Sequence, residues 1–180
     1  MFPKRTFVRA GMLQGANVAF RRKALELIGG IDPELGAGTR FPCEDIDAVT
    51  AVLWAGFDGR FDPRPVVQHD HGRLGADVPA LLDSYDRGRG GFYAKYILRP
   101  DTRTTVAWRW LRTAWNRRSW RGLRTLRLEM TYAAKYAASK GRYEFLLLGA
   151  PVCLMVLAFQ CVATFFTAIG QPLRVRRASS

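Results

Sequence analysis

The sequence predicts an α/β fold that is rich in helix, with a small remnant sheet in its first part and amphipathic and membrane-type helices towards its end. Three observations lead to this prediction. Short strand-like and helix-like segments alternate over residues 1–72, arginine and tryptophan recur at helical spacing within residues 101–142, and the run from Phe145 to Ile169 carries no charged side chain. Residues 1–100, 101–142 and 143–180 are therefore expected to form three parts.

Regular structure is expected over four segments of the first part, followed by a polar helical stretch. Asn17 to Phe20 suits a short strand, and Lys23 to Ile28 suits a helix that a glycine pair ends. Apolar side chains at helical spacing predict a second helix from Glu44 to Ala55. Prolines interrupt the stretch from Phe61 to His69, which predicts an edge or irregular strand. Residues 73–100 then predict a helical stretch broken by glycines.

The composition limits the partners that the chain is expected to bind. Lysine and arginine number 28 against 15 acidic residues, which gives a formal net charge of +13. Such a balance indicates nucleic acid, anionic lipid headgroups or phosphorylated substrates. No apolar run follows the basic N-terminal residues, so no signal peptide is expected. None of the 3 cysteines has metal-ligand spacing, which fits a reducing compartment and a cytoplasmic globular part.

The sharpest feature is a run of carboxylates, Glu44-Asp45-Ile46-Asp47, at the start of the second expected helix. Free backbone N–H groups and the helix dipole stabilise negative charge there, so acids in a first turn are common without any function. The functional interpretation is that Asp45 accepts a proton from a hydroxyl nucleophile. A carboxylate that is ionised at neutral pH and fixed on a rigid helix end suits a general base.

A second feature, His69-Asp70-His71, contains the only 2 histidines of the chain. At the end of a strand, residues i and i+2 face the same side, so both imidazoles would face one ligand. Together with carboxylates they would suit a divalent cation. A solvated pair at a strand end explains the motif equally well, and the spacing leaves both interpretations open.

In their order along the chain these motifs resemble the second half of family 2 glycosyltransferases, which have a GT-A fold. The resemblance covers roughly residues 10–100 and implies a partial GT-A fold, the acceptor-side half. The segments that carry it are Gly15-Ala16-Asn17-Val18-Ala19-Phe20-Arg21-Arg22, Gly29-Gly30-Ile31-Asp32, Leu35-Gly36-Ala37-Gly38-Thr39, Glu44-Asp45-Ile46-Asp47, Trp54-Ala55-Gly56-Phe57, Asp62-Pro63 and His69-Asp70-His71.

The resemblance implies an inverting transfer of a sugar from a nucleotide-sugar donor to a polysaccharide, cell-wall or lipid-linked acceptor. It gives Asp45 the position of the catalytic base and places Glu44 beside it in the acceptor site. Gly15 and Asn17 match the loop that closes under the donor sugar and the acceptor. Asp47 is expected to bind substrate together with them.

The resemblance also implies a metal ion. His69 aligns with the histidine that helps to hold Mg2+ or Mn2+ on the donor diphosphate, and His71 is a second candidate. Enzymes of this family begin with a nucleotide-binding half that carries an Asp-x-Asp motif, and no such half precedes Gly15. Asp45-Ile46-Asp47 spells that motif but opens an amphipathic helix, whereas the donor motif ends a buried strand. We therefore expect a fragment, or one part of a split protein, that needs a donor-binding half.

The remaining sequence predicts contact with a membrane. From Trp108 to Met130, apolar residues at helical spacing alternate with arginines, which matches a helix lying on an anionic membrane surface. A nucleic-acid patch and a face packed on the domain are the open alternatives. The run from Phe145 to Ile169 is long enough to cross a hydrocarbon core of ~30 Å, although a hairpin hinged near Pro151 is the alternative. The expected location is the cytoplasmic face of the membrane, membrane-associated or single-pass.

Two further classes of function stay open at this point. A non-catalytic membrane adaptor derived from a glycosyltransferase would use the basic helices to bind anionic lipid. A nucleic-acid-binding protein would account for the charge but not for the uncharged run of membrane length. No nucleic-acid partner is therefore expected.

Overall fold

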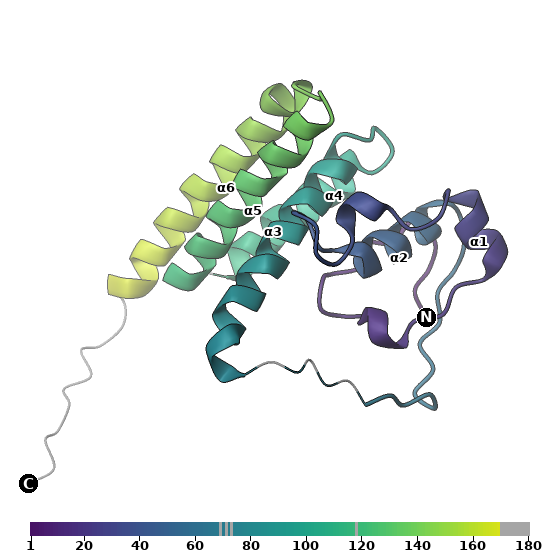
Figure 1. Cartoon of the computed structure of the whole chain (residues 1–180). Helices are drawn as coiled ribbons and strands as arrows, with labels where there is room; N and C mark the ends of the chain where they lie inside the picture. Colours follow the sequence, from purple (N-terminus) through teal and green to yellow (C-terminus); the bar gives the residue numbers. More distant parts are fainter. Residues whose placement is uncertain (69, 71, 73, 118, 170–180) are drawn as a thin grey trace, which may run out of the picture.

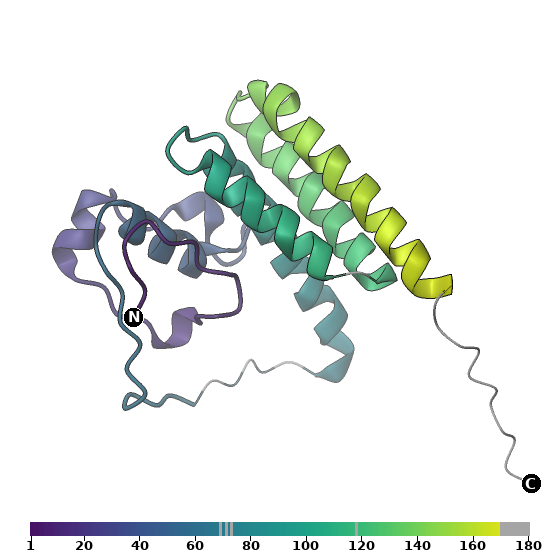
Figure 2. The same ribbon diagram turned by 180° about the vertical axis from the view of Figure 1, so that it is seen from behind.

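The computed structural model describes residues 1–169 except residues 69, 71, 73 and 118. Figures 1 and 2 show a loop-rich N-terminal part that holds α1 and α2, beside a bundle of the four longer helices. Short 3-10 turns lie at Gly15–Asn17, Pro33–Leu35 and Gly75–Asp77. The α-helices are α1 (Arg22–Leu27), α2 (Glu44–Trp54), α3 (Val78–Ile97), α4 (Arg103–Asn116), α5 (Trp120–Ser139) and α6 (Glu144–Ile169).

One hydrophobic core joins the N-terminal part to the bundle. Ile46 and Leu53 on the inner face of α2 and Phe92 and Tyr96 on α3 belong to the same buried cluster. Helix α5 packs along α3, and α4 and α6 lie against them. Because α2 is held by this shared core, the bundle fixes the position of the acidic motif.

Helix α3 runs unbroken through its glycines, which the sequence predicted to break it. A Cβ added at Gly88 would lie 1.9 Å from the carbonyl oxygen of Pro42, and one at Gly90 would lie 2.3 Å from that of Glu129. No side chain fits at such distances, so the glycines let the loop before α2 and the backbone of α5 approach α3 closely. Their role is close packing rather than helix termination.

The prediction of an α/β fold is wrong, and with it the partial GT-A fold with a remnant sheet. Among the described residues the structure is all-α, without a β-strand, and the N-terminal part contains only an isolated antiparallel bridge between Phe2 and Gly59. Asn17 ends a 3-10 turn, and Val18 is extended with φ −133° and ψ 139°. The residues described between Phe61 and Gln68 form neither helix nor strand. An extended segment forms a β-strand only when a second extended segment lies beside it and pairs with it through backbone hydrogen bonds. The local amino-acid pattern does not show whether such a second segment is present.

The arginine-rich stretch forms two helices, α4 and α5. In α4 the side chain of Trp110 is buried, whereas Trp108 points to solvent. Trp108 is therefore not on the face that packs on the core, whereas Leu111, three residues later, packs against it.

The prediction of a membrane helix over Phe145–Ile169 is also wrong. Within the described ranges no helix combines the length and the apolar character that crossing a bilayer requires. Helix α6 instead packs against α4 and α5, where Phe145 and Thr164 are buried and the ring of Phe159 contacts that of Trp115. It continues through Pro151, so the alternative of a hinged hairpin is wrong as well.

Candidate functional site

Asp45 stands in the first turn of α2, half-buried and held by two backbone N–H groups. Its Oδ2 accepts a hydrogen bond from Gly15 at 3.1 Å, and its Oδ1 accepts one from Ile46 at 2.7 Å. A Cβ at Gly15 would lie 3.2 Å from the Cβ of Asp45, which is closer than most contacts between side chains. Residue 15 therefore combines a hydrogen-bond donor with the small size that a close approach to Asp45 needs.

Asn17 connects the same loop to the segment that leads towards the histidine motif. Its Nδ2 donates a hydrogen bond to the carbonyl oxygen of Pro65 at 3.0 Å. Glu44 precedes Asp45 and is half-buried as well. The structure thus brings Gly15 to Asp45, whereas the hydrogen bond of the Asn17 side chain goes to Pro65.

The predicted metal ligands, His69 and His71, lie outside the described residues. In the part of the chain that the structure describes, no three His, Cys, Asp or Glu side chains gather closely enough to hold a metal ion. The described side chains therefore do not support a binding site for Mg2+ or Mn2+.

Asp47 lies on the other side of α2 from Asp45, because two residues turn a helix by about 200°. Its side chain is buried, and its Oδ2 accepts a hydrogen bond from Lys95 Nζ at 2.7 Å. The same Nζ donates to Oδ2 of Asp32 at 2.9 Å. Burial raises the pKa of Asp47 despite the neighbouring Lys95 charge. Burial also acts to raise the pKa of Asp32, but the hydrogen bonds from Lys95 and from the Glu34 N–H together with the Lys95 charge hold that pKa below its ordinary value. The sequence motifs give Lys95 no role, and only the fold reveals its two partners.

Beside this ion-paired group lies an open pocket of about 520 Å³. Its walls come from the loop after α1, from one face of α2 and from the end of α3. The residues that line it are Leu27, Ile28, Gly29, Gly30, Ile31, Asp32, Pro33, Asp47, Ala51, Trp54, Ala55, Lys95 and Arg99. Asp47, which the resemblance assigns to substrate binding, thus faces this pocket and not the Gly15 loop.

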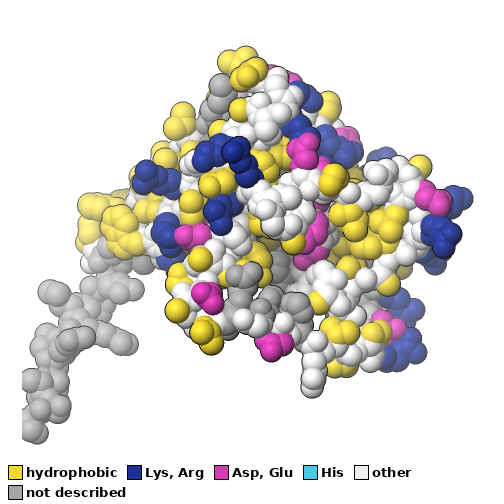
Figure 3. Space-filling view, viewed as in Figure 1, with side chains coloured by type: hydrophobic (Ala, Val, Ile, Leu, Met, Phe, Trp, Pro, Cys, Tyr) yellow, Lys and Arg dark blue, Asp and Glu magenta, His cyan; other side chains and the backbone are white. Residues whose placement is uncertain are grey.

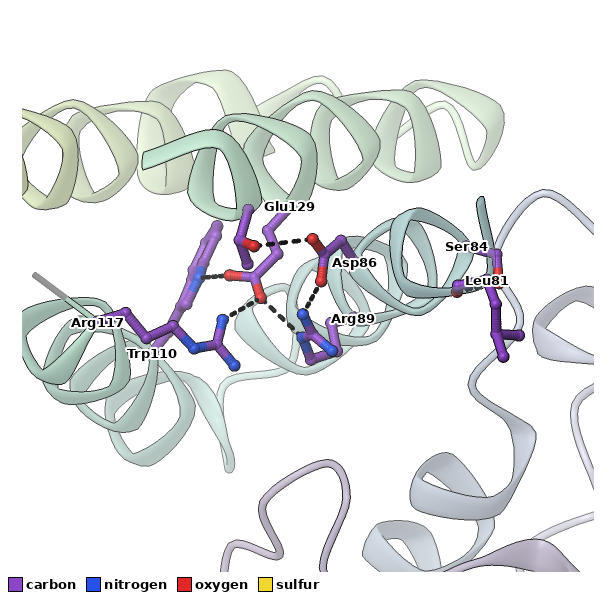
Figure 4. Close-up of polar contacts among 8 residues, drawn as sticks. Leu81, Ser84, Asp86, Arg89, Trp110, Arg117 and Glu129 are labelled. Atoms are coloured by element: carbon purple, nitrogen blue, oxygen red, sulfur yellow. Dashed lines mark hydrogen bonds and ion pairs between the residues drawn. The ribbon is translucent and has the colours of Figure 1, made fainter. Parts of the chain in front are cut away.

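A buried ionic network centred on Glu129 joins α3, α4 and α5 (Figure 4). Only 1% of Glu129 is exposed, and its carboxylate accepts hydrogen bonds from Arg89 Nε at 2.8 Å and Arg117 Nη1 at 2.9 Å. The indole of Trp110 donates to its Oε2 at 2.8 Å. Burial opposes the charge of Arg89, yet the carboxylates of Glu129 and Asp86 keep its pKa above the ordinary value. This network holds the bundle together. In the sequence, its only sign is that Glu129 is a single acidic residue within an arginine-rich stretch.

The outer face of the bundle combines exposed apolar and basic side chains. Trp108 on α4 is 63% exposed and Trp120 on α5 is 75% exposed. Figure 3 shows Lys and Arg side chains spread over one side of the bundle and hydrophobic side chains gathered at the C-terminal end of α6. Exposed large apolar side chains of α6 are Leu147, Leu154, Met155, Phe159, Val162, Phe165, Phe166 and Ile169.

Comparison with known proteins adds no relative. Neither a protein-family model nor a curated protein nor a solved structure matches this chain. The likeness to family 2 glycosyltransferases therefore stays a prediction from the motifs.

Proposed function

We propose that this chain supplies the acceptor-side part of an inverting family 2 glycosyltransferase, which transfers a sugar from a nucleotide-sugar donor to a polysaccharide, cell-wall or lipid-linked acceptor. A donor-binding part, from polypeptide outside the described residues, completes the enzyme. The proposal takes the reaction from the resemblance of the motifs and the placement of the base from the contacts of Asp45.

The observation that supports the proposal is the hydrogen bond from Gly15 to Oδ2 of Asp45. It joins two motifs that lie 30 residues apart in the sequence. A general base needs a fixed carboxylate that a substrate still reaches, and Asp45 is half-buried with its oxygens oriented by backbone N–H groups.

In the proposed reaction the carboxylate of Asp45 accepts the proton of an acceptor hydroxyl. The hydroxyl oxygen forms a bond to the anomeric carbon of the donor sugar. The bond from that carbon to the diphosphate breaks, and its electron pair leaves with the nucleoside diphosphate. A single displacement of this kind inverts the anomeric configuration. Gly15 and Asn17 hold the loop over Asp45, and Glu44 stands next to the base.

For the Mg2+ or Mn2+ that the resemblance implies, His69 would be the ligand from this chain and His71 the second candidate. Such an ion would neutralise negative charge on the departing nucleoside diphosphate. Replacing His69 by alanine is expected to weaken metal-dependent binding of a nucleoside diphosphate by the reconstituted enzyme. Calorimetry that finds the larger loss with His71→Ala moves the assignment to His71.

The decisive test is Asp45→Asn in the chain reconstituted with a donor-binding part. This change keeps the shape of the side chain but removes the proton acceptor, so we expect turnover to fall by at least ~10²-fold. Binding of the nucleotide sugar should change little. Asp101→Asn, which alters an exposed acid between α3 and α4, is the matched control and should keep full turnover. Wild-type-like transfer by Asp45→Asn would remove Asp45 from the role of base.

The alternative is a non-catalytic adaptor that binds anionic membrane surfaces, and the exposed tryptophans and arginines of α4 and α5 favour it. The two functions separate in one experiment. If the reconstituted chain binds vesicles but transfers no sugar from any nucleotide sugar, the adaptor replaces the enzyme as the proposal.

A further inference from the structure

Helix α6 exposes an apolar face on the side that points away from the bundle. The sequence from Phe145 to Ile169 has no charged side chain. The bundle covers one side of the helix, where Phe145 and Thr164 are buried. The opposite side carries exposed residues spaced three or four positions apart, and this spacing places them on one face. They are Leu147, Pro151, Leu154, Ala158, Val162, Phe165 and Ile169.

The apolar surface of α6 is larger than a monomer usually leaves in contact with water. The described large apolar side chains on its outside keep between 46% and 78% of their surface exposed. At ~150–200 Å² for each fully exposed side chain, they present roughly 800 Å² together. The largest apolar patch of a typical monomer is about 300–600 Å², whereas a standard interface covers about 800 Å² on each partner. The face is therefore large enough for a stable interface.

The order of the residues on this face suits a second copy of the same helix. Residues before and after Ala158 stand at matching distances from it along the chain. In an antiparallel pair of helices with a two-fold axis at Ala158, each of these residues faces its counterpart on the other copy. The small side chain of Ala158 lets the two helices approach at the axis. The facing pairs are Leu147 with Ile169, Pro151 with Phe165, and Leu154 with Val162.

Charge and position agree with this arrangement. Two copies that each carry a net charge of +13 repel one another, but the face of α6 contributes no charge to the contact. Figures 1 and 2 show α6 at the outer edge of the bundle, away from α2. Pairing through α6 therefore leaves Asp45 open in both copies. The interior of a lipid layer would also accept an apolar face, but it requires no matching distances about one residue.

We propose that the chain forms a two-fold symmetric dimer through the outer face of α6, with the two helices antiparallel and Ala158 at the axis. The dimer covers the apolar surface that the bundle leaves exposed. This inference goes beyond the proposed function and does not depend on it.

The mass of the full chain in solution, measured by analytical ultracentrifugation, tests the dimer. Interfaces of standard size have dissociation constants of micromolar or below, so at ~100 µM the mass should be twice 20.3 kDa. Leu154→Glu places a charge in the contact and should return the mass to 20.3 kDa. Val66→Glu is the control, since it changes an exposed apolar residue of the N-terminal part and should stay dimeric.

A double variant tests the antiparallel pairing itself. Leu154→Glu combined with Val162→Lys in one chain places opposite charges face to face twice across the axis, so the dimer should return. Within one helix these positions are too far apart to pair, because only neighbours three or four residues away meet. If circular dichroism shows that Leu154→Glu fails to fold, Ala158→Glu decides instead, because it brings two like charges together at the axis.

Three results overturn the inference. The first is a wild-type chain that remains at 20.3 kDa. The second is a double variant that is as monomeric as Leu154→Glu. The third is a monomer that floats with neutral phosphatidylcholine vesicles, which would assign the face to lipid. The Leu154→Glu monomer should keep its turnover in the reconstituted transfer assay, so failure of the dimer and failure of the proposed catalysis are separate outcomes.

Discussion

Gly90 on α3 lies so close to Glu129 on α5 that a Cβ at residue 90 would stand 2.3 Å from the Glu129 carbonyl oxygen. The obstacle is backbone and not the end of a flexible side chain, so the two helices have to separate if residue 90 gains a methyl group. Helix α5 carries the buried network, and its distance from α3 sets the geometry of the whole bundle.

Gly90→Ala should therefore destabilise the protein even though alanine is the better helix former. The helical preference favours alanine by about 1 kcal/mol, and overpacking costs about 1–3 kcal/mol or more. Because the clash is with backbone, we expect the cost of overpacking to exceed the gain in helix propensity. Urea unfolding should therefore show a lower midpoint for Gly90→Ala than for the wild type. Gly75→Ala, which has no atom within 4 Å of the added Cβ, is the control and should leave the midpoint nearly unchanged. A Gly90→Ala protein as stable as the wild type would contradict the helix spacing.

Glu129→Gln should cost far more stability than any change to a surface ion pair. It removes the negative charge that faces Arg89 and Arg117 in a buried site, and breaking such a pair costs about 3–5 kcal/mol. Asp101→Asn breaks the exposed pair with Arg99 and should cost under about 1 kcal/mol. Chemical unfolding measures both. Equal losses in the two variants would mean that Glu129 is hydrated in solution.

Gly15→Ala should reduce turnover without reducing stability much. The new Cβ would press on Asp45 at 3.2 Å and displace it by a few tenths of an ångström. Since a misplacement of about 1 Å costs roughly 10²-fold, we expect a loss of up to about tenfold. The reconstituted transfer assay and a thermal melt measure the two effects, with Gly75→Ala again as control. If Gly15→Ala instead lowers the melting temperature strongly and keeps full activity, the prediction is contradicted.

Stability should depend on pH in opposite ways through Asp32 and Asp47. The lowered pKa of Asp32 means that its contribution is present above the unfolded value of about 3.9 and is lost as pH falls through the folded value. The raised pKa of Asp47 makes stability decline as pH rises from about 3.9 through its folded pKa. Asp32→Asn should thus flatten the acid limb of a stability curve, and Asp47→Asn should remove the decline at higher pH. The measurement is the free energy of unfolding of each variant from about pH 3 to 7. If both substitutions alter its pH dependence in the same direction, the arrangement in which Lys95 pairs with both acids is contradicted.

The chain should bind anionic vesicles at low salt and leave them at high salt. Each basic residue near an anionic surface contributes about 1 kcal/mol, and salt screens that attraction. Exchanging Trp108 and Trp120 for alanine should weaken binding at constant charge, because tryptophan rings settle at headgroup depth. Phe61→Ala, an exposed aromatic in the N-terminal part, serves as control. Equal binding to neutral vesicles in a co-sedimentation assay would exclude the electrostatic contribution.

The helices that carry a strong local pattern could be predicted from the sequence. The apolar stripe and the acidic first turn placed the start of α2 at Glu44, where the structure has it. For α1 the predicted Lys23–Ile28 and the observed Arg22–Leu27 differ by one residue at each end. In both cases the signal lies within a few turns of the chain, where periodicity and end residues decide.

The predictions that failed, and the partners that were missed, depend on contacts between segments that are distant in the sequence. Whether Val18 belongs to a strand depends on a neighbour that the chain does not place beside it. Lys95 meets Asp47 across 48 residues and Asp32 across 63, and no local pattern announces such partners. The glycines of α3 read as breaks because their spacing gives no sign of the backbone that passes over them. The hydrogen bond from Gly15 to Asp45 likewise spans 30 residues, and no local pattern predicts it.

The contact between Gly88 and the carbonyl oxygen of Pro42 has a consequence for protein engineering. Pro42 ends the loop that enters α2 just before the acidic motif, and α3 forms the wall against which it rests. Loop redesign aimed at a new acceptor has to preserve that backbone approach, because any shift of Pro42 is passed directly to the start of α2. For the same reason, the smallest unit that can keep Asp45 in place extends through α3, which ends at Ile97.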